Sequence, residues 1–377
     1  MGRKIASHYA LIGGELRRGC IVEVADDGTI VGIEQCDNID NRAGVEFHPG
    51  ILIAGMINAH CHLELAYLSG AIEEATGFAG FASAIGRVRG NYSEEQRLRA
   101  ASVTDAMMWE EGIQAVADIA NDTLVMPIKR KSRIEYRTFF EFFGLCNTEC
   151  DKLLATAKQE GATLTPHSTY SVQDEPFRKI CNSESEIYSL HFLESEQEGA
   201  LYRGNGSLAE WYARMGWQCD FLHYGGAAER LRQSIPQHKR LLLVHACEAS
   251  PEDVTMLNSH FEHRPSWVLC PESNRYISDI KPPVAMLRSM GAEIALGTDS
   301  LASARSLSMI ENMRLLSDDV ELLELLRWAT IGGAKALGIA DRLGDIAIGK
   351  RPGLVVIEGA DLSNLRLTEE IRSRRIL

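Results

Sequence analysis

The sequence predicts an α/β protein built on a (β/α)8 TIM barrel, with further short strands at both chain ends. Apolar runs of strand length alternate with stretches of helical period through the middle of the chain, which gives eight strand–helix units. Polar residues follow nearly every predicted strand, as expected where the carboxyl ends of barrel strands form an active site. We therefore expect the barrel to carry the function.

The predicted barrel strands are short apolar runs, and the helices between them show apolar residues spaced three or four apart. The first strand ends at His60, and the others cover 113–120, 136–144, 162–170, 186–194, 240–247, 266–270 and 292–298. Helical stretches include 94–110, 207–215, 227–234 and 307–316. A doubly wound open sheet is the alternative. It is disfavoured because the first strand–helix turn lacks the G-x-G-x-x-G phosphate loop.

Both chain ends are rich in strands. Residues 19–24 and 29–33 flank Asp26-Asp27-Gly28, which is typical of a hairpin turn. Near the other end, the turn at 349–353 leads into an apolar strand at 354–358.

Composition and charge restrict the functional classes. The 377 residues carry a net charge of −13, which argues against a nucleic-acid surface because phosphate binding needs clustered Lys and Arg. The basic runs 129–131 and 372–375 are expected to decorate a solvated loop and a tail. No apolar run reaches the roughly 18–20 residues of a membrane span, and the amino terminus lacks the apolar core of a signal peptide. Nine scattered cysteines, Cys36 among them, are typical of free thiols in a reducing cytoplasm.

Two histidines mark the end of the first barrel strand. His60 and His62 are two residues apart, so in a strand both side chains project from the same face. His191 and Asp299 close two later strands and would meet them at the same edge. Three imidazoles and a carboxylate suit a divalent cation that keeps one open position. The alternatives are half-buried structural histidines and, for Asp299, a helix cap for the residues that follow it.

Glu194 lies three residues after His191, where a carboxylate can overhang the metal without binding it. A partly desolvated carboxylate beside activated water suits proton transfer. The alternative is a surface acid in a patch with Glu196 and Glu198, and we expect those two neighbours to lie in solvent.

Three more polar residues end predicted strands and are candidates for the same site. His245 follows an apolar strand and is either a functional group or a neutral core histidine. His167 ends the fourth strand and is placed to donate to a substrate, and Glu141 near the end of the third strand is expected to contact it as well.

We expect a single metal ion. Binuclear hydrolases of similar barrels commonly bridge two metals with a carboxylated Lys after the fourth strand, and residues 162–170 contain no Lys. Zinc is the expected ion, with Fe²⁺ and Mn²⁺ as alternatives. The chain has no G-x-S-x-G elbow, no G-x-x-x-x-G-K-[ST] loop and no P-C-x-x-C partner for its H-x-E run. Serine hydrolysis, P-loop chemistry and the small zinc deaminase fold are therefore unsupported.

The segment 66–91 after the first strand is long for a loop of this kind, and such loops usually carry function. It contains Phe78 and Phe81, which would cover a flat ring, followed by Arg87 and Arg89. The alternative is that both Phe pack a helix onto the barrel and both Arg lie in solvent.

Taken together, these motifs resemble the amidohydrolase superfamily, in its cytosine deaminase and chlorohydrolase-like branch. The resemblance covers nearly the whole chain, and the run Cys-His-Leu-Glu-Leu at 61–65 is most similar to aminofutalosine deaminase-like members. The matching segments are 49–62 (PGILIAGMINAHCH), 166–168 (PHS), 191–194 (HFLE), 270–274 (CPESN), 297–303 (GTDSLAS) and 344–354 (GDIAIGKRPGL). The chain departs from the pattern at Glu272, where relatives often carry Arg, and at Gly353, where many carry Ala. The Glu272 departure bears on the charge that the substrate carries.

The resemblance implies a role for each candidate. The metal ligands would be His60, His62, His191 and Asp299. Glu194 would be the proton shuttle, His245 would orient the attacking hydroxide or polarise the leaving nitrogen, and His167 would contact substrate. The resemblance also implies a composite β-sandwich from residues 1–52 and 346–377 beside a barrel domain at 53–345.

The function expected from these observations is a metal-dependent hydrolytic deaminase. Its substrate would be a small aminated heterocycle, purine- or nucleoside-like, such as aminofutalosine or an adenosine derivative. The alternatives are hydrolysis of a cyclic amide, an imidazolone or a chlorinated ring, and a barrel that binds a ligand without turnover. We expect no nucleic-acid or membrane partner, and a homodimer is the candidate assembly.

Overall fold

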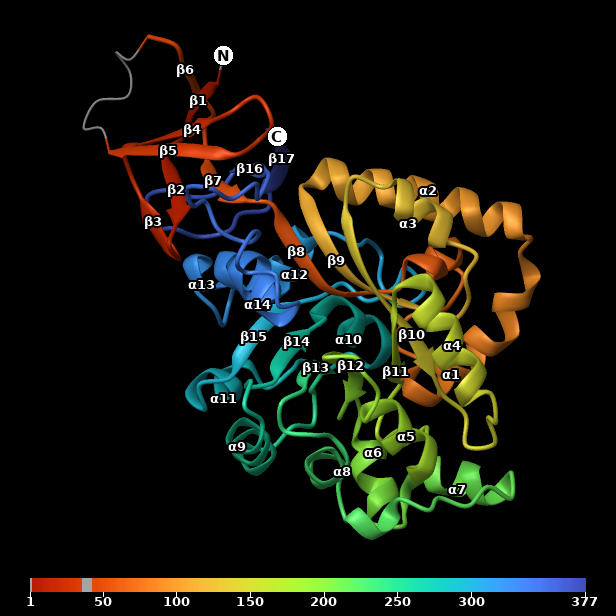
Figure 1. The fold of residues 1–377 in the computed structure, drawn as a ribbon. Helices are drawn as coiled ribbons and strands as arrows, with labels where there is room; N and C mark the ends of the chain where they lie inside the picture. Colours follow the sequence, from red (N-terminus) through yellow and green to blue (C-terminus); the bar gives the residue numbers. More distant parts are fainter. Residues whose placement is uncertain (1, 36–42) are drawn as a thin grey trace.

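The computed structural model describes residues 2–35 and 43–377, so Cys36 and part of the expected domain at 1–52 lie outside it. An α/β body carries a smaller all-β part at one end, and both chain ends lie in that part (Figure 1). The predicted sites therefore depend on the α/β body.

The α/β body contains two four-stranded sheets, with strand orders β11-β10-β9-β8 and β12-β13-β14-β15 in the described residues. All pairings within them are parallel. The strands are β8 (Met56–Cys61), β9 (Ile113–Ala120), β10 (Glu135–Phe142), β11 (Thr163–Pro166), β12 (Ile187–Phe192), β13 (Arg240–His245), β14 (Ser266–Leu269) and β15 (Glu293–Leu296). Every predicted barrel strand is present, so the expected α/β class is confirmed.

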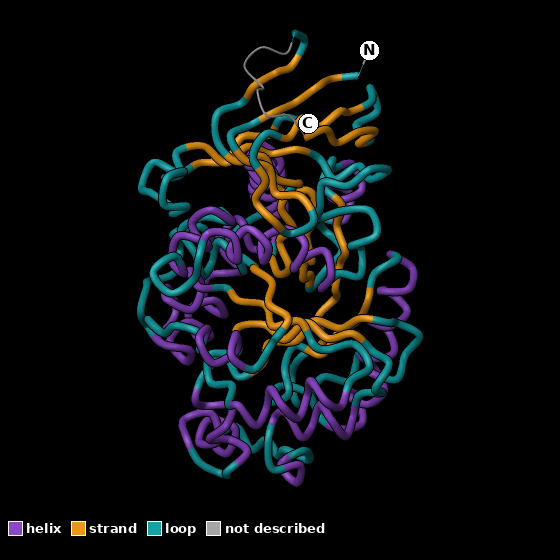
Figure 2. The backbone as a smooth tube through the Cα atoms, turned by 90° about the vertical axis from the view of Figure 1, so that its left-hand side faces the viewer, coloured by secondary structure: helices purple, strands orange, loops and turns teal. Residues whose placement is uncertain are grey.

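The two parallel sheets meet at two seams. At one seam the only described bridge is between Cys61 and Asp299, and at the other it is between Ser168 and His191. Helices lie outside the central strands (Figure 2). The expected closed barrel is therefore not shown as a continuous ladder, because each seam has an isolated bridge in place of a paired strand register.

The helices alternate with the parallel strands. The longest described helix, α2, begins with a capping box, in which the Ser93 hydroxyl accepts from Gln96 N–H and the Gln96 side chain accepts from Ser93 N–H. Within the described ranges, no helix combines the length and the apolar character that crossing a bilayer requires. The helices are α1 (Gly77–Val88), α2 (Glu94–Glu111), α3 (Met126–Lys131), α4 (Cys150–Glu160), α5 (Asp174–Cys181), α6 (Glu196–Tyr202), α7 (Gly206–Arg214), α8 (Ala227–Ser234), α9 (Pro251–His260), α10 (Pro271–Ser278), α11 (Val284–Ser289), α12 (Met309–Leu316), α13 (Leu322–Arg327) and α14 (Gly333–Ala336).

Strands from both chain ends form two more sheets, with orders β5-β4-β1-β6 and β17-β16-β7-β2-β3. One apolar cluster joins them, and it includes Ile5 and Val22 from the first sheet with Leu52 and Val356 from the second. The strands are β1 (Arg3–Ala6), β2 (Tyr9–Ile12), β3 (Glu15–Arg17), β4 (Cys20–Val24), β5 (Ile30–Gln35), β6 (Val45–Phe47), β7 (Ile51–Ala54), β16 (Leu354–Glu358) and β17 (Arg372–Arg375).

The apolar run before His60 divides at Gly55 into two strands of different sheets. Strand β7 pairs with β16 and β2, while β8 begins at Met56 and pairs with β9. The sheet of the chain ends therefore extends to Ala54, two residues beyond the boundary expected at 52. A Cβ atom at Gly55 would lie 2.7 Å from Cβ of Gln114 and 2.8 Å from the Pro352 carbonyl oxygen. Only glycine fits at this junction.

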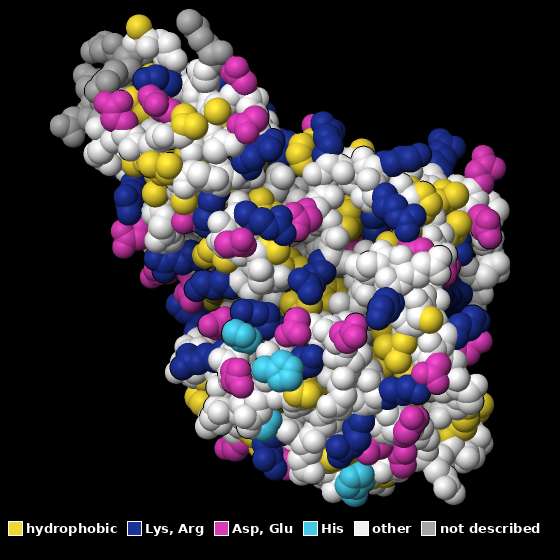
Figure 3. All heavy atoms as spheres, viewed as in Figure 1, with side chains coloured by type: hydrophobic (Ala, Val, Ile, Leu, Met, Phe, Trp, Pro, Cys, Tyr) yellow, Lys and Arg dark blue, Asp and Glu magenta, His cyan; other side chains and the backbone are white. Residues whose placement is uncertain are grey.

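The two basic runs are not the solvated loop and tail expected from sequence. Lys129 is buried in α3, where its ammonium pairs with the equally buried Asp118. The guanidinium of Arg375 in β17 lies 3.5 Å from the ring centroid of Trp109 and donates to the Trp109 carbonyl oxygen. Acidic and basic side chains are intermixed on the face seen in Figure 3. The expectation failed because a run of basic residues gives no local sign of which side chain has a buried partner.

We predict that Gly55→Ala destabilises the protein, because the new methyl group would overlap Gln114 and Pro352. The loss should be about 1–3 kcal/mol in the free energy of unfolding, the usual cost of overpacking. Urea unfolding followed by circular dichroism measures it. Gly86→Ala is the matched control, since nothing lies within 4 Å of a Cβ atom there. Equal stability of both variants would contradict the prediction.

Candidate active site and metal centre

The ends of three parallel strands, β8, β12 and β15, bring four predicted residues together. His60 lies in β8 and His62 directly follows that strand, while His191 lies in β12. Asp299 follows β15, and its bridge to Cys61 places it beside His60 and His62. All four side chains are buried.

The ligand atoms of this cluster are crowded. The Nε2 atom of His60 lies 3.2 Å from Nε2 of His62 and 3.1 Å from Nε2 of His191. Oδ1 of Asp299 lies 3.4 Å from Nε2 of His62 and 3.9 Å from Nε2 of His60. Tetrahedral ligands at about 2.0–2.1 Å from zinc are roughly 3.3 Å apart. The spacing therefore fits ligands of one divalent cation.

The protonation states suit metal binding. Burial lowers the pKa of His60 and of His191, and the neighbouring histidines lower both further. Burial alone would raise the pKa of Asp299, but the facing imidazoles outweigh it and lower that pKa to about 2. Neutral imidazoles and an ionised carboxylate are the forms that bind a metal.

Asp299 is held by its surroundings rather than by a helix. Its Oδ2 atom accepts hydrogen bonds from the hydroxyls of Ser273 at 2.6 Å and Ser303 at 3.0 Å, which leaves Oδ1 toward the histidines. The helix that follows, α12, is capped by Ser308 instead. The alternative of a helix cap at Asp299 is therefore not seen. The φ angle of Asp299 is +60°, a strained conformation that functional sites often hold.

Glu194 and His245 form a second pair beside the cluster. Oε1 of Glu194 lies 3.8 Å from Nε2 of His245, while Nδ1 of His245 lies 2.8 Å from Oδ1 of Asn274. His245 has a φ angle of +74°, and Leu193 next to Glu194 has +47°. Burial raises the pKa of Glu194, so its carboxyl holds a proton more readily than a solvated one does.

His167 and Glu141 lie around His191. Nε2 of His167 is 3.0 Å from Nδ1 of His191, and Oε1 of Glu141 is 4.0 Å from that same nitrogen. The Asn121 amide donates to the other oxygen of Glu141 at 3.3 Å. Burial lowers the pKa of His167 to about 4, so this imidazole is neutral near pH 7.

In the described part of the chain, three overlapping sets of residues have ligand atoms within 4.8 Å of one another. His60 belongs to two of these sets, and His191 belongs to two. The sets are His60, His62 and Asp299; His60, His191 and His245; and Glu141, His167 and His191. The three sets are therefore linked through His60 and His191.

The predicted loop at 66–91 contains a helix, α1, preceded by a 3₁₀ turn at Leu63–Leu68. The Phe78 ring centroid is 6.0 Å from that of Tyr170, whose ring is 6.1 Å from His167. Phe81 instead packs on an apolar cluster under the helix. The exposed Arg87 donates to Ser83 within α1, so the structure does not bring it to the ligand cluster.

Two buried carboxylates, Glu198 and Glu64, were not expected from the sequence. Glu198 was expected in solvent, but it is 1% exposed and accepts a hydrogen bond from Leu193 N–H. Glu64 is equally buried and accepts from Asn121 N–H at 2.9 Å. The spacing from Ser195 to Glu198 is that of a capping box, yet no side-chain cap forms at α6. The capping-box spacing therefore gave no indication that Glu198 bonds to Leu193 instead.

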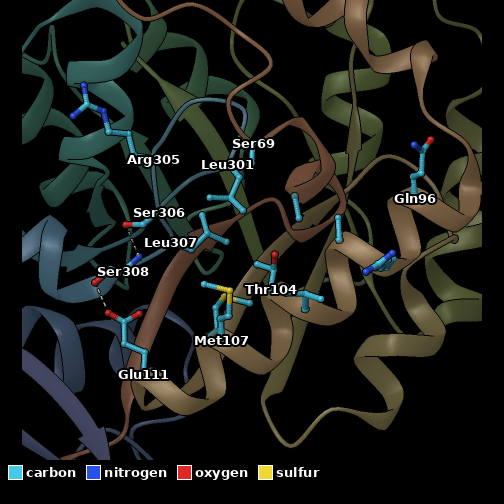
Figure 4. A pocket seen from close by; sticks show the side chains of 15 residues that line it. Ser69, Gln96, Thr104, Met107, Glu111, Leu301, Arg305, Ser306, Leu307 and Ser308 are labelled. Atoms are coloured by element: carbon cyan, nitrogen blue, oxygen red, sulfur yellow. Dashed lines mark hydrogen bonds between the residues drawn. The ribbon is translucent and has the colours of Figure 1, made fainter.

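A separate cavity of about 640 Å³ lies between α2 and residues 301–308 (Figure 4). Its walls are mainly apolar, with Met107 and Leu307 among them, and Glu111 bonds to Ser308 at one side. None of the predicted metal ligands lines it.

The sequence is similar to that of known proteins. The family model described as "Amidohydrolase family" matches residues 51–374. An adenosine deaminase of Helicobacter pylori is 26% identical over 334 residues, covering 82% of this chain and 79% of that protein. A 5-methylthioadenosine/S-adenosylhomocysteine deaminase of Teredinibacter turnerae is 28% identical over 212 residues, which cover 52% of this chain and 43% of that protein.

Solved structures share the fold. A crystal structure of Helicobacter pylori aminofutalosine deaminase has a TM-score of 0.79 at 25% identity and covers 98% of this chain and 94% of its own. An adenosine deaminase from Xanthomonas campestris with bound zinc has a TM-score of 0.74 at 20% identity, covering 96% and 85%. Both neighbours share the fold of this chain along nearly its whole length.

We predict about one divalent ion per chain, because the crowded ligand atoms surround one position. His60→Ala and His191→Ala should each lose most of the metal, while the exposed His238→Ala should keep it. Elemental analysis of the purified variants measures the stoichiometry. Two ions per chain, or unchanged loading in both site variants, would exclude a single centre.

Proposed function

Since the chain belongs to the amidohydrolase family, and is thus a hydrolase of carbon–nitrogen bonds, we propose that it deaminates an aminated purine or nucleoside. The observation that carries the proposal is the buried cluster of His60, His62, His191 and Asp299, with Glu194 and His245 beside it. Relatives named as adenosine and 5-methylthioadenosine/S-adenosylhomocysteine deaminases support this reaction.

We propose zinc as the metal, with Fe²⁺ and Mn²⁺ as alternatives, held by His60, His62, His191 and Asp299. The donor set supports this, since three neutral imidazoles and one carboxylate suit a borderline-soft divalent ion. When bound, such an ion supplies Lewis acidity and lowers the pKa of water toward about 7.

In the proposed reaction, water adds to the ring carbon that bears the amino group, and the carbon–nitrogen bond then breaks to release ammonia. Asp299, ionised and facing the histidines, accepts a proton from the water. Glu194, whose pKa burial raises, delivers a proton to the ring nitrogen and regains one from the added hydroxyl as the carbonyl forms. Asp299 passes its proton to the departing amino nitrogen, which leaves as ammonia. His245, held through Nδ1 by Asn274, presents Nε2 to the oxygen that becomes negative.

The proposed substrate contacts surround this centre. His167 and Glu141 lie beside His191, and Phe78 reaches the same region through Tyr170. Arg87 on α1 would meet only a part of the substrate that extends away from the reacting ring, because its side chain is exposed.

A second candidate function is hydrolysis of a chlorinated ring. An S-triazine hydrolase of Gordonia rubripertincta is 22% identical over 191 residues, which cover 48% of this chain and 35% of that protein. Chloride release from a triazine, in place of ammonia release from a purine, would identify this alternative.

For the fold, we propose that the two parallel sheets are halves of one (β/α)8 barrel at 53–345. The bridges at both seams support closure. We propose that the sheets of the chain ends form a composite β-sandwich from 1–52 and 346–377, and their shared apolar cluster supports it.

Glu194→Gln should keep the fold and the metal but lower the rate by about 10²–10⁴-fold, the usual contribution of a general acid or base. The amide cannot deliver a proton. Glu196→Gln is the control, because Glu196 is the first residue of α6 and its side chain is exposed. Ammonia release from adenosine and 5-methylthioadenosine measures the rate. Equal rates in the two variants would remove Glu194 from the mechanism.

Substrates with a remote anionic group should react faster than unsubstituted adenine if α1 recognises them. Arg87→Ala should then raise KM for the anionic substrate and leave KM for a neutral analogue nearly unchanged, because a surface charge acts only on the charged group. Steady-state ammonia release across aminated purines, pterins and nucleosides measures both. Unchanged KM for every substrate would show that α1 packs on the α/β body without recognising the substrate.

A further inference from the structure

The buried carboxyl of Glu198 joins two strand exits. It lies in the first turn of α6, the helix that follows β12 along the chain (Figure 1). Oε2 accepts a hydrogen bond from Leu193 N–H at 2.6 Å, and Oε1 accepts one from the hydroxyl of Thr169. Leu193 follows β12 and Thr169 follows β11, so this carboxyl spans the seam beyond the Ser168–His191 bridge.

The residue that Glu198 holds is the one before Glu194. Leu193 has a φ angle of +47°, which costs a branched residue free energy and persists only where neighbours hold it. Its N–H bonds to Glu198, and its carbonyl oxygen accepts from Glu248 N–H at 2.9 Å. The peptide that carries Glu194 is thus fixed from both sides.

The other end of the link is rigid as well. Thr169 is fully buried, and its carbonyl oxygen accepts hydrogen bonds from the hydroxyl of Tyr202 at 2.9 Å and from the guanidinium of Arg230. Arg230 itself is buried among the rings of Phe177 and Phe221. Glu198 therefore connects the Leu193 turn to Thr169, whose backbone is itself held by buried hydrogen bonds.

We propose that Glu198 is a positioning residue, which fixes the carboxyl of Glu194 against His245 by holding the Leu193 backbone. The inference rests on the proposed role of Glu194. A solely structural role would instead make Glu198 support α6 without effect on Glu194. The two differ in whether Glu198 acts through Glu194.

Kinetics separate these roles. Glu198→Ala should lower kcat on the order of 10-fold to 100-fold, the scale of a small misplacement of a reacting group. KM and metal content should stay near the parent values, because substrate and metal contacts lie on other residues. Glu196→Ala is the matched control on the exposed side of α6. Burial raises the pKa of Glu198 to about 8, so the neutral amide of Glu198→Gln should restore most of the rate.

A double-mutant cycle tests the connection to Glu194. In a Glu194→Gln background, Glu198→Ala should cost less than about 3-fold, because residues that act as a unit are not additive. Ammonia release from adenosine is the assay. The same loss in both backgrounds would overturn the proposal. If Glu194→Gln itself is as fast as the parent, the proposed function of Glu194 fails instead.

Crystal structures provide a readout that needs no substrate. In Glu198→Ala the Leu193 turn should relax and the Glu194 carboxyl should move away from His245, while His60, His62 and His191 stay in place. Glu198→Asp serves if the Ala variant does not fold, since the shorter side chain cannot reach both partners. An unmoved Glu194 carboxyl in the folded variant would overturn the proposal.

Discussion

The crowding of buried ligand atoms at the strand ends is the constraint on which the rest of the structure depends. Neighbouring nitrogen and oxygen atoms lie 3.1 to 3.4 Å apart, and neutral imidazoles cannot all donate to one another. Burying such a set costs free energy unless a cation satisfies it. The left-handed turns at His245 and Asp299 and the serine hydroxyls around Asp299 keep it in place.

The strands and the ligand cluster could be predicted from the sequence because both follow local periodicity. All eight predicted strands of the α/β body are present, and the Nε2 atom of His60 lies 3.2 Å from that of His62 and 3.1 Å from that of His191. The division at Gly55 could not be predicted, since the apolar run is continuous there and only the approach of Gln114 and Pro352 explains the glycine.

Buried charges were the other failure, and their causes differ. Lys129 is hidden in a basic run, and its partner Asp118 comes from a neighbouring strand. Glu198 has the spacing of a helix cap, but its carboxyl turns to Leu193 and Thr169. In each case the tertiary partner decides burial, and a local pattern of polar residues carries no information about that partner.

The pairing of β7 with β16 has a consequence for how the protein is made. During synthesis the early strands leave the ribosome long before residues 354–358 exist, so β7 has an unpaired edge for most of that time. The whole α/β body is synthesised after β7 and before β16. Contacts so distant in sequence form slowly, and an open strand edge invites pairing with another chain. Completion of this sheet is therefore the step that removes the open edge of β7, and it must wait until residues 354–358 are made.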